Sequence, residues 1–210
     1  MKYQKEINKI SKIFVAYLKN NGIMGAKELG KIVVGDRDIP IMCNMVENKK
    51  IPEDGFTING YFNIPNPLLN LFDEFMVELK EENGIESEPY ILINIAVNDK
   101  NIKDYTIDNT VGIFKWVLRH EIQHSVQYYV LGYKLTPNDV QLSKFDVFLK
   151  PEELDAHFYG IMAYKMHYKN KYSLEKIIDY IYDNIVDDFS EREISLIKQI
   201  LIAYVEDRLL

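Results

Sequence analysis

The sequence predicts an α+β domain that is mostly helical and contains a small mixed β-sheet. Several segments repeat apolar residues at intervals of three and four, which is typical of helices that bury one face. Two shorter apolar runs, at 38–45 and 89–99, predict strands. With 210 residues, no internal repeat and no low-complexity tract, the chain is long enough for its own core, and we expect a single domain over 1–210.

Residues 1–88 are expected to form an N-terminal subdomain of helices and loops. Apolar residues at helical spacing predict a helix over 3–20, and the Asn-Asn-Gly run at 20–22 is a good signal for its end. A short helix is expected over 26–35, ahead of the strand at 38–45. The N-terminal subdomain would therefore begin with two helices and a strand.

Turn-forming residues and a second helical pattern complete the N-terminal subdomain. Residues 47–60 are rich in turn formers and predict a loop or hairpin. Residues 64–84 begin with two prolines and then place large apolar residues on one side, which predicts a helix that Gly84 ends. The charged run at 47–55 offers an exposed loop that a protease can cut.

The central part of the domain is expected over 89–172, and it begins with the clearest strand, at 89–99. A polar loop follows, and a helix is then expected from about 110 to 131, with Gly132 as its C-cap. Residues 133–150 form a long mixed connection to the next helix.

Helix-start signals define the rest of the chain. Pro151 is well placed as the first residue of a helix with an acidic first turn. Two C-terminal helices are expected over 173–210: Ser173 can cap the first, and Ser190 with Glu193 forms a capping box for the second. Both carry enough apolar residues to close the core or to face a partner.

Charge and composition exclude several classes of function. The net charge of -7 argues against nucleic acid as a partner, because phosphate binding needs a basic surface. The single Cys43 lies in an apolar run and predicts a buried, inert thiol rather than a disulfide. The N-terminus lacks the apolar stretch of a secretion signal and no stretch is long enough to span a membrane, so we expect no membrane partner and a cytoplasmic location.

The stretch "RHEIQHSVQYY", residues 119–129, carries the clearest chemical signal in the sequence. His120 and His124 are four residues apart, so on a helix their imidazoles lie on one face within reach of one cation. Neutral imidazoles suit zinc, and Glu121 is rotated off their axis, where it can address a water molecule on the metal. This is the H-E-x-x-H arrangement, with Glu121 as the catalytic general base.

A catalytic zinc site needs a third protein ligand. The short histidine spacing of metzincins is absent, because position 127 is Gln and position 130 is Val. The segment "KPEELDAHFYG", residues 150–160, offers two acidic residues at the start of a helix, Glu152 and Glu153. Its small residues recur on a stripe that favours close helix packing, but Glu152 and Glu153 lie about equally far to either side of it. Spacing alone leaves both open as the ligand.

At this point the sequence resembles the gluzincin class of zinc metallopeptidases. The motif "HEIQH" is followed by "ELDAH", which is similar to the E-x-x-A glutamate helix of small gluzincins and of lethal-factor-type proteases. The resemblance covers about residues 89–168, and it implies a zincin-like fold in which His120, His124 and Glu153 bind one Zn²⁺ per chain. Glu152 stays the alternative ligand, and a peptide or protein is the implied substrate. The N-E-x-x-S-D pattern of thermolysin-like enzymes is absent.

Two more residues are candidates for supporting the chemistry. His157 lies one turn after Glu153, where it can support a ligand, contact the oxyanion or simply pack. Gluzincins often donate a hydrogen bond to the oxyanion from a Tyr or His, and Tyr159 is available, although the chain has fifteen tyrosines. The strand at 89–99 precedes the metal helix, as does the edge strand that binds substrate in zincins.

Two classes of function follow from these patterns. The first is a zinc-dependent peptidase, of which a latent variant would cover its cleft with the N-terminal 60–90 residues. The second is a non-enzymatic interaction protein on a zincin-like scaffold, with its C-terminal helices as the interface. The sequence leaves the physiological substrate, the cleavage specificity and the oligomeric state open.

Overall fold

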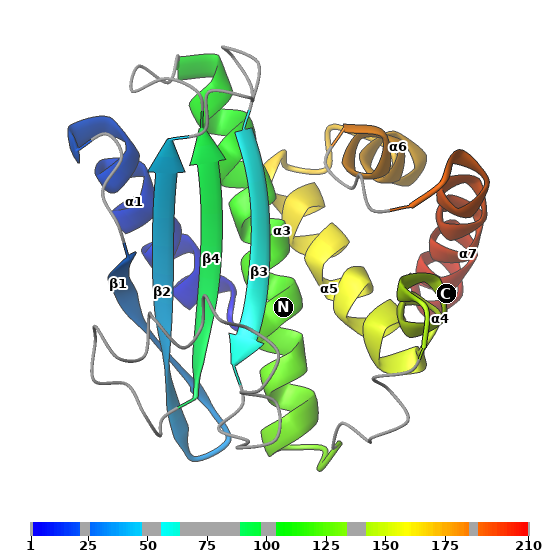
Figure 1. The fold of residues 1–210 in the computed structure, drawn as a ribbon, viewed down its shortest axis with the longest axis horizontal. Coiled ribbons are helices and arrows are strands. Elements are labelled where there is room, and N and C mark those ends of the chain that lie inside the picture. The colour runs from blue at the N-terminus through cyan, green and yellow to red at the C-terminus, as the bar shows by residue number, and fades with distance from the viewer. Residues whose placement is uncertain are drawn as a thin grey trace.

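The fold is seen in a computed structural model, which describes residues 2–21, 26–47, 56–63, 89–97, 104–133, 142–184 and 189–209. These residues form six helices and a four-stranded mixed sheet, so the predicted α+β class is confirmed. Figure 1 shows the sheet with helices behind one of its faces and a second group of helices beside its β3 edge. The predicted helix at 64–84 lies outside the described residues.

The sheet has the strand order β1-β2-β4-β3. Strands β1 (Ala26–Val34) and β2 (Arg37–Glu47) form an antiparallel hairpin, and β2 runs parallel to β4 (Tyr90–Val97). Strand β3 (Phe56–Asn63) pairs antiparallel with β4. Among the described strands β3 is therefore an edge, and β4, although predicted correctly as a strand, lies in the interior and not at the edge.

The helix predicted over 26–35 is wrong, because this segment is strand β1. Leu29, Ile32 and Val34 are buried on the helix-covered face of the sheet. Gly35 has a φ of 64° and begins a two-residue turn that pairs Val34 with Arg37. A positive φ at this place is typical of the tight turns that join antiparallel strands, so Gly35 specifies a hairpin where the spacing suggested a helix.

Part of the predicted loop or hairpin at 47–60 is strand. Residues 56–60 belong to β3, which continues to Asn63. The strand is hard to recognise because its segment "FTINGYFN" includes Gly and two Asn residues, which are depleted in strands. Its apolar side chains on the helix side, Ile58 and Phe62, lie in or against the main core.

Helices α1 (Gln4–Asn21) and α3 (Asp104–Tyr129) cover one face of the sheet (Figure 1). The prediction of α1 is confirmed, and its Phe14 stacks on Phe114 of α3 with 4.1 Å between ring centroids. Helix α3 begins earlier than the predicted position near 110, and it ends before Gly132, whose φ of 74° suits the predicted C-cap.

The remaining helices pack around α5 (Pro151–His167), which begins at the predicted proline. A short helix, α4 (Lys144–Phe148), interrupts the predicted connection before α5. Helices α6 (Leu174–Asn184) and α7 (Glu191–Leu209) follow with the predicted Ser173 and Ser190 caps. Three apolar residues of α7, Ile197, Leu201 and Val205, are buried in the core, and Leu196 and Leu209 are exposed. Helix α7 thus closes part of the core, as one of the two roles expected for it.

The N-terminal strands are an integral part of the sheet. Strand β2 lies between β1 and β4, so a cut between β2 and β3 would separate β1 and β2 from the rest of the chain. The loop predicted at 47–55 lies outside the described residues, apart from Glu47 at the end of β2. Cys43 on β2 is fully buried, and burial raises the pKa of its thiol to about 12, as expected for an inert cysteine. None of the described helices is both long enough and apolar enough to cross a membrane.

Candidate metal site

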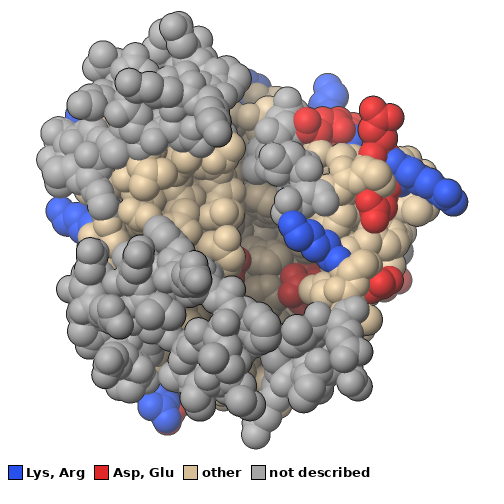
Figure 2. Space-filling view, in the orientation of Figure 1, with Lys and Arg blue, Asp and Glu red and all other residues tan. Residues whose placement is uncertain are grey.

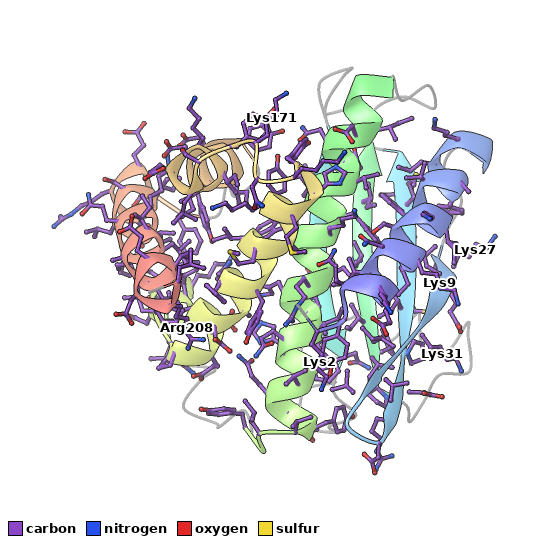
Figure 3. All side chains as sticks on the ribbon, turned by 180° about the vertical axis from the view of Figure 1, so that it is seen from behind. Lys2, Lys9, Lys27, Lys31, Lys171 and Arg208 are labelled. Carbon is purple, nitrogen blue, oxygen red and sulfur yellow. The ribbon has the colours of Figure 1, made fainter. Side chains whose placement is uncertain are left out.

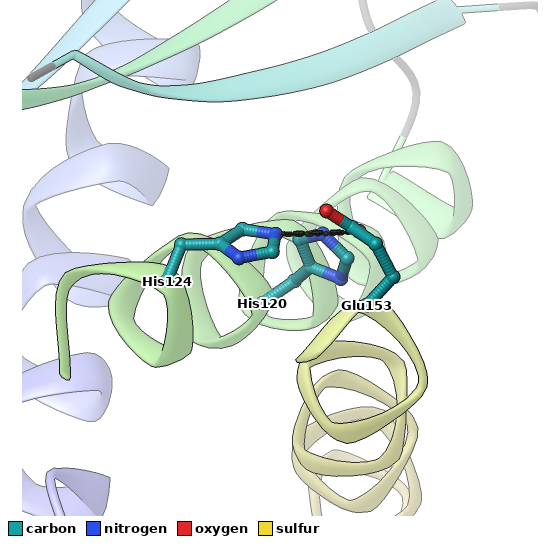
Figure 4. Close-up of side chains that lie close together, drawn as sticks. All are labelled: His120, His124 and Glu153. Carbon is teal, nitrogen blue, oxygen red and sulfur yellow. Dashed lines mark hydrogen bonds and ion pairs between the residues drawn. The ribbon is translucent and has the colours of Figure 1, made fainter. Parts of the chain in front are cut away.

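Three side chains from two helices converge at one point. The Nε2 atoms of His120 and His124 lie 2.9 Å apart on α3. One carboxylate oxygen of Glu153, from the first turn of α5, lies 3.7 Å from the first of these nitrogens and 3.4 Å from the second. Figure 4 shows the two imidazoles and the carboxylate pointing toward one another. This group can hold a metal ion, and within the described part of the chain no other such group of side chains is found.

The close approach of α5 to α3 brings Glu153 to the histidines. At Gly160 a methyl group would lie 2.6 Å from the Trp116 ring and 2.9 Å from the Trp116 backbone oxygen, so only glycine fits. Ala156 and Ala163 on the same stripe are fully buried. The stripe of small residues therefore does what its spacing suggests, and the register it produces turns Glu153 rather than Glu152 toward His120 and His124.

Gln127 connects the two helices beside the site. Its side-chain oxygen lies 2.9 Å from His124 Nδ1, and its amide nitrogen donates to the backbone oxygen of Glu152 at 2.7 Å. Because the amide nitrogen is used on Glu152, the oxygen faces His124 and accepts the proton on Nδ1. His124 Nε2 is then left to face Glu153 and His120, which is the orientation that a metal ligand needs.

Proton affinities in the group reflect its burial and its mixed charges. Burial lowers the pKa of His124, but the hydrogen bond and charge of Glu153 outweigh this and raise it to about 9. Burial also raises the pKa of Glu153, yet the two histidines together hold it below its usual value. Burial, with the neighbouring histidines, brings the pKa of His120 well below its usual value. Glu153 therefore favours the protonated form of His124, whereas burial favours the neutral form of His120.

Glu121 lies under the edge strand of the sheet, next to the three converging side chains. It is buried, and the backbone N–H of Phe62 on β3 donates a hydrogen bond to its carboxylate. Gly60 makes this approach possible, because a methyl group there would lie 2.5 Å from Val117 and 2.8 Å from the Glu121 side chain. Burial raises the pKa of Glu121 to about 7, against the opposing effect of His124. Its position beside the histidines, not among them, fits a proton acceptor.

His157 packs against the outer side of the His120 ring. The two ring centroids are 4.5 Å apart, and the Phe148 ring lies equally close to His157. The Tyr182 hydroxyl of α6 lies 2.9 Å from His157 Nδ1. Burial lowers the pKa of His157 to about 3, so this imidazole is neutral. It lies behind a ligand rather than among the converging atoms.

The other two candidates from the sequence lie apart from the converging atoms. The ring of Tyr159 lies over the guanidinium of Arg119, with 4.2 Å from the ring centroid to Cζ. Glu152 offers its backbone oxygen to Gln127, and the carboxylate nearest the histidines is that of Glu153. This geometry favours Glu153 over its neighbour as the ligand.

Several residues of this site were missed in the sequence. Gln127 is one turn after His124, and that spacing could have identified it as a partner of the imidazole. Gly60 and Tyr182 gave no comparable signal, because each reaches the site only through tertiary packing. His167 does not belong to this group of side chains, and lies largely buried between Lys115 and Asp108.

The surface is hollowed where these elements meet. Figure 2 shows a depression between the sheet and the helices beside its β3 edge, with acidic atoms on its walls.

Comparisons of the chain with protein-family models, with curated proteins and with solved structures give no match. The chemistry of the site is therefore inferred from the residues and geometry of this chain alone.

Proposed function

We propose that this protein is a zinc-dependent peptidase of the gluzincin type. The observation that carries the proposal is the convergence of His120, His124 and Glu153, with the buried carboxylate of Glu121 directly beside them. Two imidazoles and one carboxylate from two helices form a ligand set that catalytic zinc sites use. The additional carboxylate supplies the proton acceptor that hydrolysis needs.

The separations of the ligand atoms suit a tetrahedral zinc ion. Zinc bonds to nitrogen and oxygen of about 2.0–2.1 Å in tetrahedral geometry imply ligand atoms roughly 3.3 Å apart. The three separations of 2.9, 3.4 and 3.7 Å lie around this value. Three protein ligands leave one position of the tetrahedron open, as catalytic rather than structural sites do.

In the proposed reaction three residues bind the metal and a fourth transfers a proton. His120, His124 and Glu153 would hold the zinc ion, which when bound would supply Lewis acidity to a water molecule and to the carbonyl of the scissile bond. Glu121 accepts a proton from the attacking water and delivers it to the nitrogen of the leaving amine. Its pKa of about 7 in the metal-free protein is close to the value that suits a group with both tasks.

The edge strand gives this reaction a place for an extended substrate. Strand β3 is an edge among the described strands, and the backbone N–H of Phe62 points to Glu121. A peptide that adds to an exposed strand edge is held by its backbone, so its sequence matters less than its extended conformation. A peptide held along β3 would place one of its amide bonds next to Glu121, and we therefore propose unfolded or extended segments as substrates.

His157 and Tyr182 support the site in this proposal. The Tyr182 hydroxyl fixes His157, and His157 in turn packs on the ring of His120. A fixed neighbour restricts the rotation of an imidazole that has to present Nε2 to a metal. We propose that this pair orients His120, and we assign Tyr159 no contact with the substrate.

Glu121→Gln tests the proposal directly. The variant keeps the size of the side chain and the acceptor for the Phe62 N–H, but it cannot take a proton from water. The wild-type protein, loaded with zinc, should cleave denatured proteins or a mixed peptide library, and mass spectrometry should detect the new N-termini. The variant should bind one zinc per chain and lose cleavage by about 100-fold or more.

Two results would contradict the proposal in different ways. Cleavage retained in Glu121→Gln would remove this residue from the role of general base. No cleavage by wild-type protein with full zinc occupancy, over a broad set of substrates, would instead favour a non-enzymatic protein that keeps a metal in a zincin-like scaffold.

A further inference from the structure

A chain of polar side chains joins α3, α5 and α7 on the side of α5 away from the converging ligands. Both terminal nitrogens of Arg119 on α3 donate to the side-chain oxygen of Gln123, each at 3.2 Å. The amide nitrogen of Gln123 donates to Asp155 on α5 at 2.8 Å. Arg208, in the last turn of α7, donates to the other carboxylate oxygen of Asp155 at 2.5 Å.

The donor and acceptor groups of these side chains determine the direction of each hydrogen bond. Arginine can only donate, so the oxygen of Gln123 faces Arg119 and its NH₂ group faces Asp155. Both oxygens of Asp155 then accept, one from α3 and one from α7. Asp155 of α5 is therefore the residue that connects α3 and α7 through hydrogen bonds.

The side chains of this hydrogen-bonded group are largely buried, which restricts their movement. Arg119 is 2% exposed and Gln123 is 5% exposed, and the Asp155 side chain is 16% exposed. The rings of Tyr159 and Tyr3 lie over the Arg119 guanidinium, which adds a favourable cation–π contact to the buried charge. Removing one partner from such a group leaves a buried donor or charge without a partner, and this lowers the stability of the fold.

Gln123 on α3 and Asp155 on α5 are close in sequence to the proposed metal ligands of the same helices. Gln123 directly precedes His124, and Asp155 is two residues after Glu153. The first turn of α5 is thus fixed to α3 twice, by Gln127 at the Glu152 backbone oxygen and by Gln123 at Asp155. Glu153 lies between these two attachments, so its distance from the histidines depends on both.

We propose that Asp155 is a positioning residue for Glu153, and that Arg208 sets the metal affinity of the site from the C-terminal end of α7. The inference rests on the proposed metal site. Figure 3 shows Arg208 at the end of α7, beside the first turns of α5. A ligand or modification that drew the last turn of α7 away from Asp155 would loosen Glu153 without touching the metal.

The test is the zinc affinity of Asp155→Asn, measured by competition with a chromophoric chelator. Asparagine keeps the volume but replaces one acceptor with a donor, so either Gln123 or Arg208 would face a like group. Loss of a hydrogen bond that orients a ligand weakens metal binding by about 10–100-fold, and we expect a loss in this range. In the Co²⁺-substituted protein, the visible absorption at saturation should also change, because Glu153 is displaced from the metal.

Arg208 and a matched pair on the same helix provide the controls. Arg208→Ala should weaken zinc binding as Asp155→Asn does, and Arg208→Lys should restore part of the affinity because it keeps a cation opposite Asp155. Asp183→Asn removes a carboxylate on α6 that pairs with Lys198 of α7, also at 2.5 Å, and Lys198 keeps Asp179 as a second partner. It should leave the zinc affinity and the Co²⁺ spectrum unchanged.

The outcomes separate this inference from the proposed function. Wild-type zinc affinity in Asp155→Asn and Arg208→Ala would overturn the inference and leave the metal site intact. Equal losses in Asp183→Asn would also overturn it, because general loosening of α7 would then explain the effect. Absence of zinc binding in the wild-type protein would end both the proposed function and the inference.

Discussion

The burial of Glu121 is unfavourable for the fold but suits the role proposed for this residue. A buried carboxylate with a single backbone donor is unfavourable for the fold, and here burial raises its pKa to about 7. A proton acceptor, however, works best when its pKa lies near the operating pH. The fold thus tolerates at Glu121 a group that a purely structural position would replace with a neutral one.

This cost leads to a prediction about the metal-free protein. The pKa of Glu121 is raised from 4.5 on folding, so its ionisation destabilises the fold as the pH rises from about 4.5 to about 7. Glu121→Gln is neutral at every pH. In the presence of a chelator it should be more stable than the wild type by roughly 1–3 kcal/mol at pH 8 and by little at pH 4.5.

Urea unfolding at the two pH values measures this difference. The wild type and the variant should have similar midpoints at pH 4.5 and separate as the pH rises. A variant that is less stable than the wild type at pH 8 would show that the Glu121 carboxylate has stabilising partners beyond those described.

Glu153 and Glu152 are adjacent residues with different expected roles. Glu153→Ala removes a ligand, so zinc affinity should fall by more than the ~10–100-fold that loss of an outer hydrogen bond causes. Glu152 contributes a backbone oxygen, which Glu152→Ala keeps, so affinity should change by about twofold or less. The chelator competition assay compares the two variants, and the reverse order would show that the wrong glutamate has been assigned.

At the scale of elements, the edge strand β3 packs closely against helix α3, which carries His120 and His124. Gly60 permits β3 to lie directly against Val117 and Glu121. The small-residue stripe on α5 has the same effect on the other side of α3, where Gly160 lies against Trp116. Helix α3 is therefore held closely on both sides, and its ligands and base keep fixed positions.

Gly60→Ala should separate zinc binding from turnover. The added methyl group would push Val117 and Glu121 aside, while His120, His124 and Glu153 keep their places. Zinc content should stay at one per chain, and kcat/KM for a peptide substrate should fall by about 100-fold, since a displacement near 1 Å has effects of this size. Unchanged turnover would mean that Glu121 does not need its place under β3.

A compensating change checks the cause. The nearest atom to the added methyl group is a methyl carbon of Val117, at 2.5 Å. Val117→Ala removes that atom, so the double variant should recover part of the lost turnover. Loss of zinc in Gly60→Ala would instead indicate a general disturbance of α3.

The elements also show what can be predicted from sequence and what cannot. Helix starts at Pro151, Ser173 and Ser190 were predictable, because caps act through neighbouring residues. Strand β1 was not, because its run of residues also fits a helical period, and the turn at Gly35 decides between the two. Strand β3 gains its stability from pairing with β4 rather than from its own residues.

The candidate site follows the same rule. His120, Glu121 and His124 belong to one helix, so their spacing determines how they are arranged. The choice of Glu153 over Glu152 depends on how two helices pack, and spacing on α5 left both open. Asp155 and Arg208 are far apart in the sequence and meet only in the folded chain, so no local pattern could indicate their contact.

At the scale of the whole molecule, metal binding is coupled to protons. Glu153 raises the pKa of His124 to about 9, so we expect His124 to carry its second proton at neutral pH in the metal-free protein. Zinc must displace this proton. We therefore expect zinc affinity to rise roughly tenfold per pH unit between pH 7 and pH 9 and to level off above that.

Calorimetry in buffers of different ionisation enthalpy counts the protons released. One proton per zinc should be released at pH 7.5, and almost none at pH 10. Release of no proton at pH 7.5 would show that the histidines are already neutral in the metal-free protein, against the strong influence of Glu153 on His124.

The most direct test of the whole account is the zinc content of protein purified without added metal, measured by elemental analysis beside His124→Ala. We expect one zinc per wild-type chain and none in the variant, and the same result after both proteins have been dialysed against zinc and then against metal-free buffer. Absence of zinc in both proteins would contradict the account, and would make the convergence of His120, His124 and Glu153 a packing contact between α3 and α5.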